Sequence, residues 1–241
     1  MIKKIADKIT ITGADDTIAP ISLLQVAEES PYVEFGLLLS KKRMGSKEFP
    51  SLRWMMELNE IMQHRTKMAL SGHICGQWVR DICLGKEDFF KEYPFWRIFS
   101  RLQLNFGGER YEMPDPDRFL SVIKTYAQER QFIFQIDGVN DGFFTLVKKL
   151  QGIDVVPLFD LSGGTGRLPE KWPQYQWYSG YAWGLSPDNL SEQMGLIAEV
   201  VGPEPIWVDA QAAFRPKDNM LFDLSEVRRF TRIARPWVIG Y

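Results

Sequence analysis

Short runs of apolar residues alternate along the whole chain with segments in which apolar residues recur every three or four positions. A short apolar run predicts a buried β-strand, and the longer spacing predicts a helix with one apolar face. Strands are expected over residues 8–12, 32–39, 68–71, 101–106, 131–136, 153–159, 175–179 and 205–208. The helical spacing is clearest at Leu190, Met194, Ile197 and Val201 and at Leu224, Val227, Phe230 and Ile233.

Residues that favour helix N-termini stand before three of the helical segments. Asp115 and Ser186 each precede a proline, which suits the first position of a helix. Asp223 is followed three positions later by Glu226, a spacing typical of a capping box. We therefore expect helices to begin directly after Asp115, Ser186 and Asp223.

The alternation of strands and helices predicts a parallel sheet covered by helices, because parallel neighbours need a crossover connection. Eight such units in 241 residues favour a closed (β/α)8 TIM barrel in the α/β class. A doubly wound open sheet is the alternative. No linker, low-complexity tract or shift in composition divides the chain, so we expect a single barrel domain over residues 1–241.

Composition and charge exclude several classes of protein. The chain is 45% hydrophobic and 25% charged, which is typical of a globular protein and not of a disordered one. Its 29 Lys and Arg residues against 31 Asp and Glu give a net charge of −2, so nucleic acid is not expected as a partner. Apolar runs such as residues 35–39 are too short to span a bilayer, so no membrane partner is expected either. We expect a cytoplasmic protein that is a monomer or a homodimer.

Cysteines and histidines are too few and too scattered for a disulfide framework or a zinc site. Cys75 and Cys83 form no Cys-x-x-Cys pair, and the histidines are His64 and His73. The motifs of dinucleotide-binding folds, P-loops, zinc proteases and serine hydrolases are also absent. We therefore expect neither a metal nor a cofactor.

Polar side chains gather at the C-terminal ends of the predicted strands, where a (β/α)8 barrel carries its functional residues. Their convergence on one mouth predicts a binding site for a small polar molecule. They include Thr12, Asp15, Asp16, residues 40–43 with Arg43, His73, Cys75, Gln103, Asn105, Gln135, Asp137, Asp160, residues 180–186, Asp209 and Gln211.

Residues 159–166 carry the strongest local signal for a site. Asp160 ends a buried apolar run, and Gly163, Gly164 and Gly166 follow within a few positions. Glycines let the backbone approach a ligand closely or turn through positive φ, and successive N–H groups can hold an anion. An ordinary surface loop after a strand is the alternative.

Other side chains at the mouth are candidates for proton transfer. His73 lies between glycines after a predicted strand, where its imidazole is either an acid–base group or a hydrogen-bonded loop residue. Cys75 acts as nucleophile or base only if its thiolate is stabilised, and is otherwise a small buried side chain. Asp15 and Asp16 form an acid–base or hydroxyl-binding pair, unless one of them only caps a helix.

Several stretches together resemble the phosphoribosylanthranilate isomerase family, (β/α)8 enzymes of tryptophan synthesis. Leu158-Phe159-Asp160 with Ser162-Gly163-Gly164-Thr165-Gly166 is similar to the family's Leu-Leu-Asp followed by Gly-Gly-Thr-Gly. Residues 181–190 are similar to its Leu-Ala-Gly-Gly-Leu-x-Pro-x-Asn-Val. Weaker similarities lie at Thr10-Ile11-Thr12-Gly13, residues 35–43, residues 103–107 and Val208-Asp209.

The resemblance implies an Amadori rearrangement, in which a phosphoribosylamine opens its ring and becomes an aminoketose. An acid protonates the ring oxygen and a base takes the C2 proton. By motif, Asp160 is the acid, while Thr12 stands where the family has its catalytic cysteine and is too weakly acidic to replace it. The base is therefore expected among Asp15, Asp16, His73 and Cys75.

The phosphate end of the site departs from the family pattern. The family holds phosphate with backbone N–H groups after its last two strands, whereas Trp183 here precedes Gly184 and residues 211–213 replace a serine turn. Arg215, Lys217 and Arg167 are candidates to supply positive charge instead. The expected ligand-binding residues are Thr12, Asp16, Arg43, Gln103, Asn105, Asp137, Gly163, Gly164, Gly184, Asp209 and Arg215.

The sequence thus predicts an isomerase-like barrel that binds a small sugar or ribosyl compound, expected to be phosphorylated, in its C-terminal mouth. Two alternatives remain open: a barrel that binds or sequesters a ligand without catalysis, and a structural or protein-interaction barrel.

Overall fold

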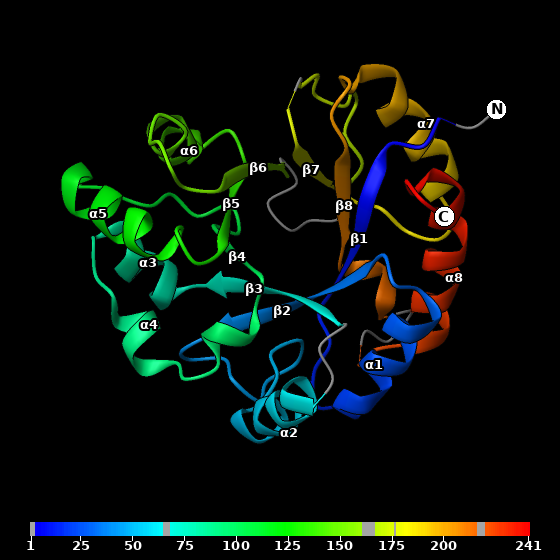
Figure 1. The fold of residues 1–241 in the computed structure, drawn as a ribbon, viewed down its shortest axis with the longest axis horizontal. Coiled ribbons are helices and arrows are strands. Elements are labelled where there is room, and N and C mark those ends of the chain that lie inside the picture. Colours follow the sequence, from blue (N-terminus) through cyan, green and yellow to red (C-terminus); the bar gives the residue numbers. More distant parts are fainter. Residues whose placement is uncertain (1–2, 65–67, 161–166, 176, 216–219) are drawn as a thin grey trace.

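Eight parallel strands close into a barrel in which each strand pairs with the next and β8 pairs with β1 (Figure 1). The computed structural model describes residues 3–64, 68–160, 167–175, 177–215 and 220–241. The strands are β1 (Ala6–Thr12), β2 (Val33–Ser40), β3 (Ala69–Cys75), β4 (Arg101–Asn105), β5 (Gln131–Ile136), β6 (Val155–Phe159), β7 (Ser179–Ala182) and β8 (Ile206–Ala210). The predicted (β/α)8 barrel and its eight strands are confirmed.

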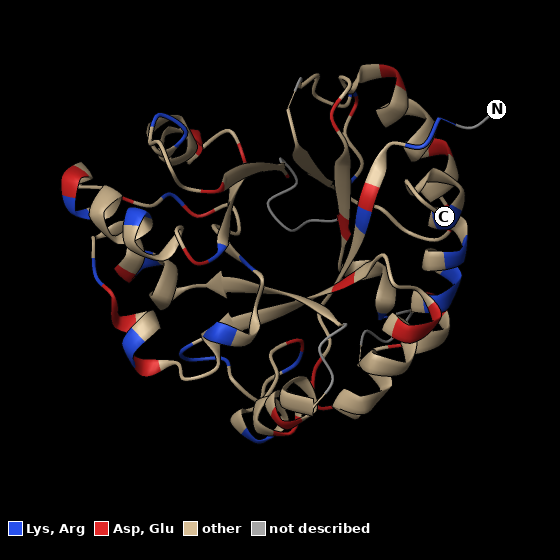
Figure 2. Cartoon of the chain, viewed as in Figure 1, with Lys and Arg blue, Asp and Glu red and all other residues tan. Residues whose placement is uncertain are grey.

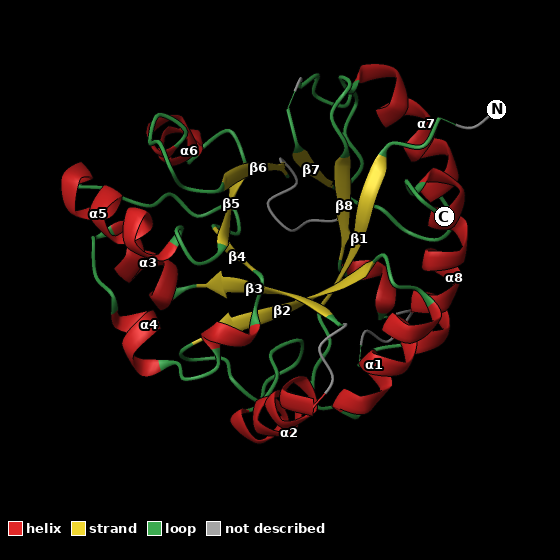
Figure 3. Ribbon diagram, viewed as in Figure 1, coloured by secondary structure: helices red, strands yellow, loops and turns green. Residues whose placement is uncertain are grey.

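Helices form a ring outside the strands (Figure 3). They are α1 (Pro20–Glu29), α2 (Leu52–His64), α3 (Gln77–Cys83), α4 (Asp88–Glu92), α5 (Pro116–Tyr126), α6 (Asp141–Val147), α7 (Leu190–Val200) and α8 (Leu224–Ala234), with the 3-10 turns η1 (Trp96–Ile98), η2 (Ala212–Phe214) and η3 (Arg235–Trp237). Within the described part of the connection between β6 and β7 there is no α-helix, so one of the eight expected units has no helix in that part.

Two strands differ from their predicted bounds by four residues at one end, and the other strands agree to within two residues at each end. β3 runs on to Cys75 because the backbone beyond Ser71 pairs with β2 on one side and β4 on the other, so His73 lies in the strand and not in a loop. β7 begins at Ser179, whereas Tyr175 makes only an isolated bridge to Val201. The prediction followed the aromatic residues, but the barrel needs small residues at this strand.

The helix N-termini follow the predicted caps at two of three places. The Asp115 carboxylate accepts the Arg118 N–H at 3.1 Å at the start of α5. Asp223 caps α8, but Glu226 contacts Arg229 instead of returning to the Asp223 N–H, so the capping box is only half formed. The expected start after Ser186 is wrong: α7 begins at Leu190.

The interior of the barrel has its own small hydrophobic cluster, separate from the large core between strands and helices. It consists of Ile133, Val156, Leu158, Ala182 and Trp207. A Cβ atom on Gly180 would lie 2.3 Å from the Trp207 ring and 2.4 Å from Leu158 Cδ1. Gly180 is therefore required so that the Trp207 indole can fill the barrel axis.

Charged residues of both signs cover the outer helices and loops (Figure 2). Among the described residues no helix is long and apolar enough to cross a membrane.

Candidate active site at the barrel mouth

Two adjoining cavities open at the C-terminal ends of the strands. The first, here called the central cavity, has a volume of about 270 Å³ and reaches the barrel floor at His73, Gln103 and Asp209. The second, the lateral cavity, has a volume of about 370 Å³ and lies toward β2, β3 and β4. Both are lined by Glu48, Asn105, Gln135, Asp160 and Gln211. The mouth can hold an elongated molecule with one end in each cavity.

Asp160, directly after β6, is held by the neighbouring strand. Gln135 on β5 donates from Nε2 to Asp160 Oδ2 at 2.7 Å. The other end of the Gln135 amide is fixed, because its Oε1 accepts the N–H groups of Phe106 at 2.8 Å and Gly107 at 3.3 Å. These contacts assign the orientation of the Gln135 amide, and they hold Oδ2 of Asp160 against Gln135 Nε2.

His73 and Asp209 line the floor of the central cavity, and Thr12, which lines neither cavity, contacts Asp209 from β1. Thr12 Oγ1 donates to Asp209 Oδ1 at 2.7 Å, and His73 Nε2 lies 3.9 Å from Asp209 Oδ2. Gly36 makes room for the side chains of Thr12 and His73, since a Cβ atom there would lie 2.2 Å from Thr12 Oγ1 and 2.8 Å from His73 Nε2. A side chain at this position of β2 would displace both groups, so the floor depends on this glycine.

Burial raises the pKa of Asp209 to about 7. The hydrogen bond from Thr12 and the charge of Arg101 lower that pKa, and the charges of Asp160 and Glu34 raise it. The Asp209 carboxyl therefore exchanges its proton near neutral pH, which suits a group that must both take and return a proton.

Burial also lowers the pKa of His73 to about 3, and the charge of Arg101 acts in the same direction. The imidazole is therefore neutral at neutral pH, and its Nε2 has no hydrogen-bond partner. Because His73 is uncharged and 3.9 Å exceeds a hydrogen bond, His73 and Asp209 are neighbours without an ion pair.

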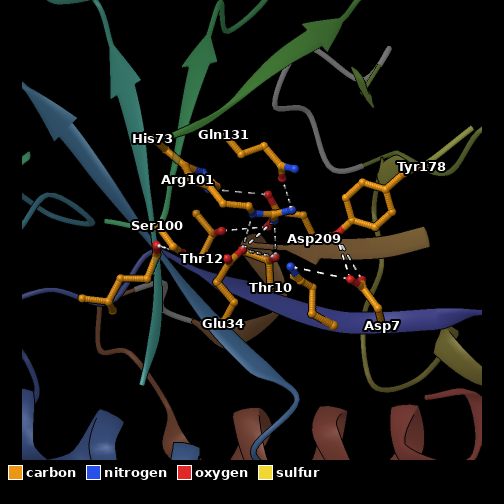
Figure 4. A network of polar contacts seen from close by, with 12 residues as sticks. Asp7, Thr10, Thr12, Glu34, His73, Ser100, Arg101, Gln131, Tyr178 and Asp209 are labelled. Atoms are coloured by element: carbon orange, nitrogen blue, oxygen red, sulfur yellow. Dashed lines mark hydrogen bonds and ion pairs between the residues drawn. The ribbon is translucent and has the colours of Figure 1, made fainter. Parts of the chain in front are cut away.

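A buried ion pair lies below this floor, inside the barrel (Figure 4). Arg101 Nη2 lies 2.6 Å from Glu34 Oε2, and Thr10 Oγ1 donates to the same oxygen at 3.0 Å. The guanidinium also donates to Gln131 Oε1 at 3.3 Å and lies over the Trp207 ring. A barrel interior is usually filled by apolar layers. Here a charged layer supports the floor of the central cavity.

The side chain of Cys75 lines only the lateral cavity. Burial raises the pKa of its thiol to about 12, and the thiol donates to the His73 carbonyl at 3.3 Å. The thiol is therefore protonated at neutral pH and does not act as a thiolate there.

The carboxylates of Asp15 and Asp16 lie outside both cavities. Asp15 pairs with Arg215 at 2.6 Å and accepts the Glu48 N–H at 2.7 Å, while Asp16 accepts the Ser51 N–H at 2.7 Å. Both therefore hold the loop after β2 in place. Arg215 is buried and also donates to the Gly13 carbonyl at 2.8 Å, so its guanidinium ties loops together and does not face the mouth.

The other candidate ligand-binding residues divide between the mouth and its surroundings. Arg43 lines the lateral cavity, with its guanidinium over the Phe49 ring, and Gly184 lines the central cavity. Asp137 lies outside both cavities, where it accepts the Asn140 N–H at 2.7 Å before α6. Gly163, Gly164, Gly166 and Lys217 lie outside the described residues.

Glu48 and Trp183 also line the central cavity. Trp183 belongs to residues 180–186, which the sequence places at the mouth, whereas no sequence pattern indicates Glu48. Both have positive φ, 71° for Glu48 and 132° for Trp183, a region that residues with a side chain rarely adopt. Strained backbone of this kind concentrates at functional sites. Glu48 also lines the lateral cavity and accepts a hydrogen bond from Gln211 Nε2 at 3.3 Å. The sequence contains no local signal for it, because the Asp15 contact fixes its position.

Within the described ranges no group of three or more His, Cys, Asp and Glu side chains is arranged to hold a metal ion.

Solved structures with a similar fold include several phosphoribosylanthranilate isomerases. A TrpF structure from Jonesia denitrificans has a TM-score of 0.56 at 13% identity, covering 96% of this chain and 98% of that one. The Thermotoga maritima isomerase has a TM-score of 0.57 at 12% identity, covering 98% and 100%. An isomerase in complex with reduced 1-(o-carboxyphenylamino)-1-deoxyribulose 5-phosphate also has 0.57, at 13% identity. No family model and no curated protein sequence matches the chain. The chain therefore shares the isomerase barrel over nearly its whole length, at a sequence identity that shows the fold alone.

Proposed function

We propose that this protein is an aldose–ketose isomerase of the Amadori type, with Asp160 as general acid and Asp209 as general base. The observation that carries the proposal is a buried carboxyl group with a pKa of about 7 in the same cavity as Asp160. A general base works best when its pKa lies near the operating pH. Asp209 has this property, although Thr12 stands at the position of the family's cysteine.

The reaction begins with two proton transfers at neighbouring atoms. Asp160 gives a proton to the ring oxygen of a glycosylamine, the C1–O bond breaks, and the nitrogen lone pair forms a C1=N iminium ion. Asp209 then takes the C2 proton, the electrons of that bond form the C1=C2 double bond of an enaminol, and the C1=N electrons return to nitrogen. Asp209 gives its proton to C1 while the C2 hydroxyl gives its proton to Asp160, which forms the C2=O bond of the aminoketose and restores both residues. The charge of Asp160 raises the pKa of Asp209, which supports the action of both residues on one small molecule.

An anionic group at the far end of the substrate fits the lateral cavity. Arg43 supplies a cation there, next to Ser40, Gly76 and Gly107. A solved isomerase of the same fold holds a deoxyribulose 5-phosphate derivative. We therefore orient the sugar carbons C1 and C2 toward Asp209 and a phosphate, where the substrate carries one, toward Arg43.

The proposal is tested by proton exchange at C2. The protein is incubated in ²H₂O with aminoketoses and aldosylamines, with and without a terminal phosphate, and loss of the C2 or C1 proton signal is followed by NMR. Asp209→Asn and Asp160→Asn are each expected to slow turnover by roughly 10² to 10⁴ while ligand affinity changes little. The matched control is Asp117→Asn, an exposed carboxylate in the first turn of α5, which should react like the parent.

Two outcomes contradict the proposal. If Asp209→Asn turns over like the parent, Asp209 is not the base. If a ligand binds but no exchange occurs in the parent protein, the barrel binds without catalysis, which was the alternative expected from the loss of the family's cysteine at Thr12.

A further inference from the structure

We propose that the central cavity selects a protonated aliphatic amine, so that the substrate carries a basic amino group at the sugar carbon that enters this cavity. This inference rests on the proposed function and names the class of its substrate. It concerns the charge of the nitrogen substituent, which the reaction type alone leaves open.

The charges that line the central cavity are of one sign. Glu48, Asp160 and Asp209 contribute carboxyl groups, and no Lys or Arg is among the described residues that line it. Residues 161–166, which follow Asp160 in the chain, contain no Lys or Arg either. An anion placed here would meet like charges in a partly buried site, where such repulsion is weakly screened.

Two buried cations near the central cavity are already paired. Arg101 is bound to Glu34 at 2.6 Å below the floor, and Arg215 is bound to Asp15 at 2.6 Å outside the cavity. Each of these guanidinium groups is buried with its own carboxylate. The carboxylates therefore offset most of the positive potential that Arg101 and Arg215 would create in the central cavity.

Two buried polar atoms on the floor lack a partner, which is a second and independent sign of a ligand. Gln103 is 3% exposed and its Oε1 accepts no hydrogen bond, and His73 is 2% exposed and its Nε2 is unpaired. An unpaired buried polar atom costs free energy until a partner arrives. Gln103 Oε1 can only accept, so the missing partner must be a donor.

An ammonium group matches this set of acceptors. It has three N–H donors and no acceptor, and it can donate to Gln103 Oε1 and to the carboxylates of Asp209 and Asp160. In the proposed reaction the bound ammonium then passes one proton to the Asp160 carboxylate, which makes Asp160 the acid and frees the nitrogen lone pair for ring opening. His73, neutral because burial holds its pKa at about 3, accepts through Nε2 in the tautomer that carries its proton on Nδ1. A phosphate or carboxylate offers only acceptors and would leave Gln103 Oε1 unpaired. The cavity therefore favours a cationic group by hydrogen bonding and by charge.

The test uses three ketoses that differ only in the group at C1: 1-amino-1-deoxyfructose, fructose and fructose 1-phosphate. Their dissociation constants are measured by calorimetry with the full chain at about pH 8, where Asp209 is ionised. The amine is expected to bind at least about tenfold more tightly than fructose, the size of one charge-assisted hydrogen bond. Fructose 1-phosphate is expected to bind more weakly than fructose. The advantage of the amine over fructose should shrink in high salt and as the pH falls through 7.

Gln103→Leu is the variant that separates the two effects. It keeps the charge of the cavity but removes the unpaired acceptor, so the amine should lose affinity while fructose changes less. His64→Leu, at the far end of α2, is the control and should leave all three constants unchanged. Circular dichroism confirms that each variant is folded, and the comparison of ligands on the parent chain decides the question even if Gln103→Leu does not fold.

Equal binding of the amine and fructose, or tighter binding of fructose 1-phosphate, overturns the inference. The proposed isomerisation fails separately. Amine-selective binding without proton exchange at C2 would refute the proposed isomerisation and support the amine site. Proton exchange on neutral or anionic sugars, without preference for the amine, would support the isomerisation and refute the amine site.

Discussion

The hydroxyl of Thr12 lies 2.7 Å from Asp209 Oδ1 and donates to it across the β1–β8 pair. Thr12 stands where the family that the sequence resembles has its catalytic cysteine, and here it orients a carboxylate on the next strand. In the proposed mechanism the proton-accepting group of the floor lies on β8 and not on β1.

Replacing Thr12 with Val should raise the pKa of Asp209 above 7. The hydrogen bond from Thr12 stabilises the ionised carboxylate, so its loss favours the protonated form. A shift of about one pH unit corresponds to one ordinary hydrogen bond. The measurement is a ¹³C NMR titration of the Asp209 carboxyl, with the exposed Thr125→Val as control. An unchanged pKa would show that the hydrogen bond from Thr12 does not stabilise the ionised Asp209 carboxylate.

The stability of the protein should respond to pH through two opposing groups. The native pKa of His73 is lowered from 6.5 to about 3, so His73 contributes stability that is present above 6.5 and lost as the pH falls through 3. The native pKa of Asp209 is raised from 3.8 to about 7, so its contribution is present below 3.8 and lost as the pH rises through 7. Between about pH 4 and 6.5 the two slopes cancel.

Removing either group should expose the slope of the other. Urea unfolding of His73→Gln between about pH 4 and 6.5 should show a free energy of unfolding that falls with pH, relative to the parent, by about 1.4 kcal/mol per pH unit. For Asp209→Asn the free energy of unfolding should rise with pH by a similar amount relative to the parent. Parallel curves for both variants would mean that neither pKa is shifted in the native state.

The ion pair inside the barrel should be costly to break on one side only. Glu34→Gln leaves the buried Arg101 guanidinium without its counter-charge and is expected to destabilise the protein by about 3–5 kcal/mol. The double variant Glu34→Met with Arg101→Met should lose less than the sum of its two single changes. Denaturant unfolding measures both. Glu92→Gln, which breaks the exposed pair with Lys41, is the control and should have little effect. Strict additivity would refute the coupling.

Arg43 should contribute to affinity only when the ligand carries a terminal phosphate. Arg43→Met is expected to weaken binding of fructose 6-phosphate about tenfold and to leave fructose unchanged, because Arg43 lines the lateral cavity and not the central one. Lys42→Met removes an equal charge next to it at a position that lines neither cavity. Calorimetry that shows the same loss for both variants would indicate a general charge effect and remove Arg43 from the site.

The sequence predicts the fold well because buried parallel strands are nearly continuous apolar runs. The prediction from sequence fails where a strand of the barrel contains small or polar residues in place of large apolar ones. β7 was placed too early because Gly180 and Ala182 look like loop residues, although Trp207 requires small neighbours there. β3 was ended too early because Gly72 and His73 interrupt the apolar run, although both pair on two sides.

The candidate site could be predicted only as far as topology alone places residues. Asp160, His73 and Asp209 follow from their positions at strand ends, and all three line one cavity. Glu48 could not be found, because its place depends on a contact with Asp15, which is itself held by Arg215 from the other end of the chain. Such contacts between loops leave no periodic trace in the sequence.

The pair of Glu34 and Arg101 also has a consequence for how the barrel closes during folding. The two residues lie on β2 and β4, with β3 between them, and Thr10 on β1 completes their hydrogen bonds. In a half-assembled sheet both charges remain hydrated, and the water leaves only when the strands enclose the axis. If β2 or β4 slipped by one residue, its charged side chain would point outward, and the opposite charge would remain inside the barrel without a partner. We therefore expect the native alignment of the three strands that carry Thr10, Glu34 and Arg101 to be favoured over a slip by one residue, because only that alignment pairs the two charges inside the closed barrel.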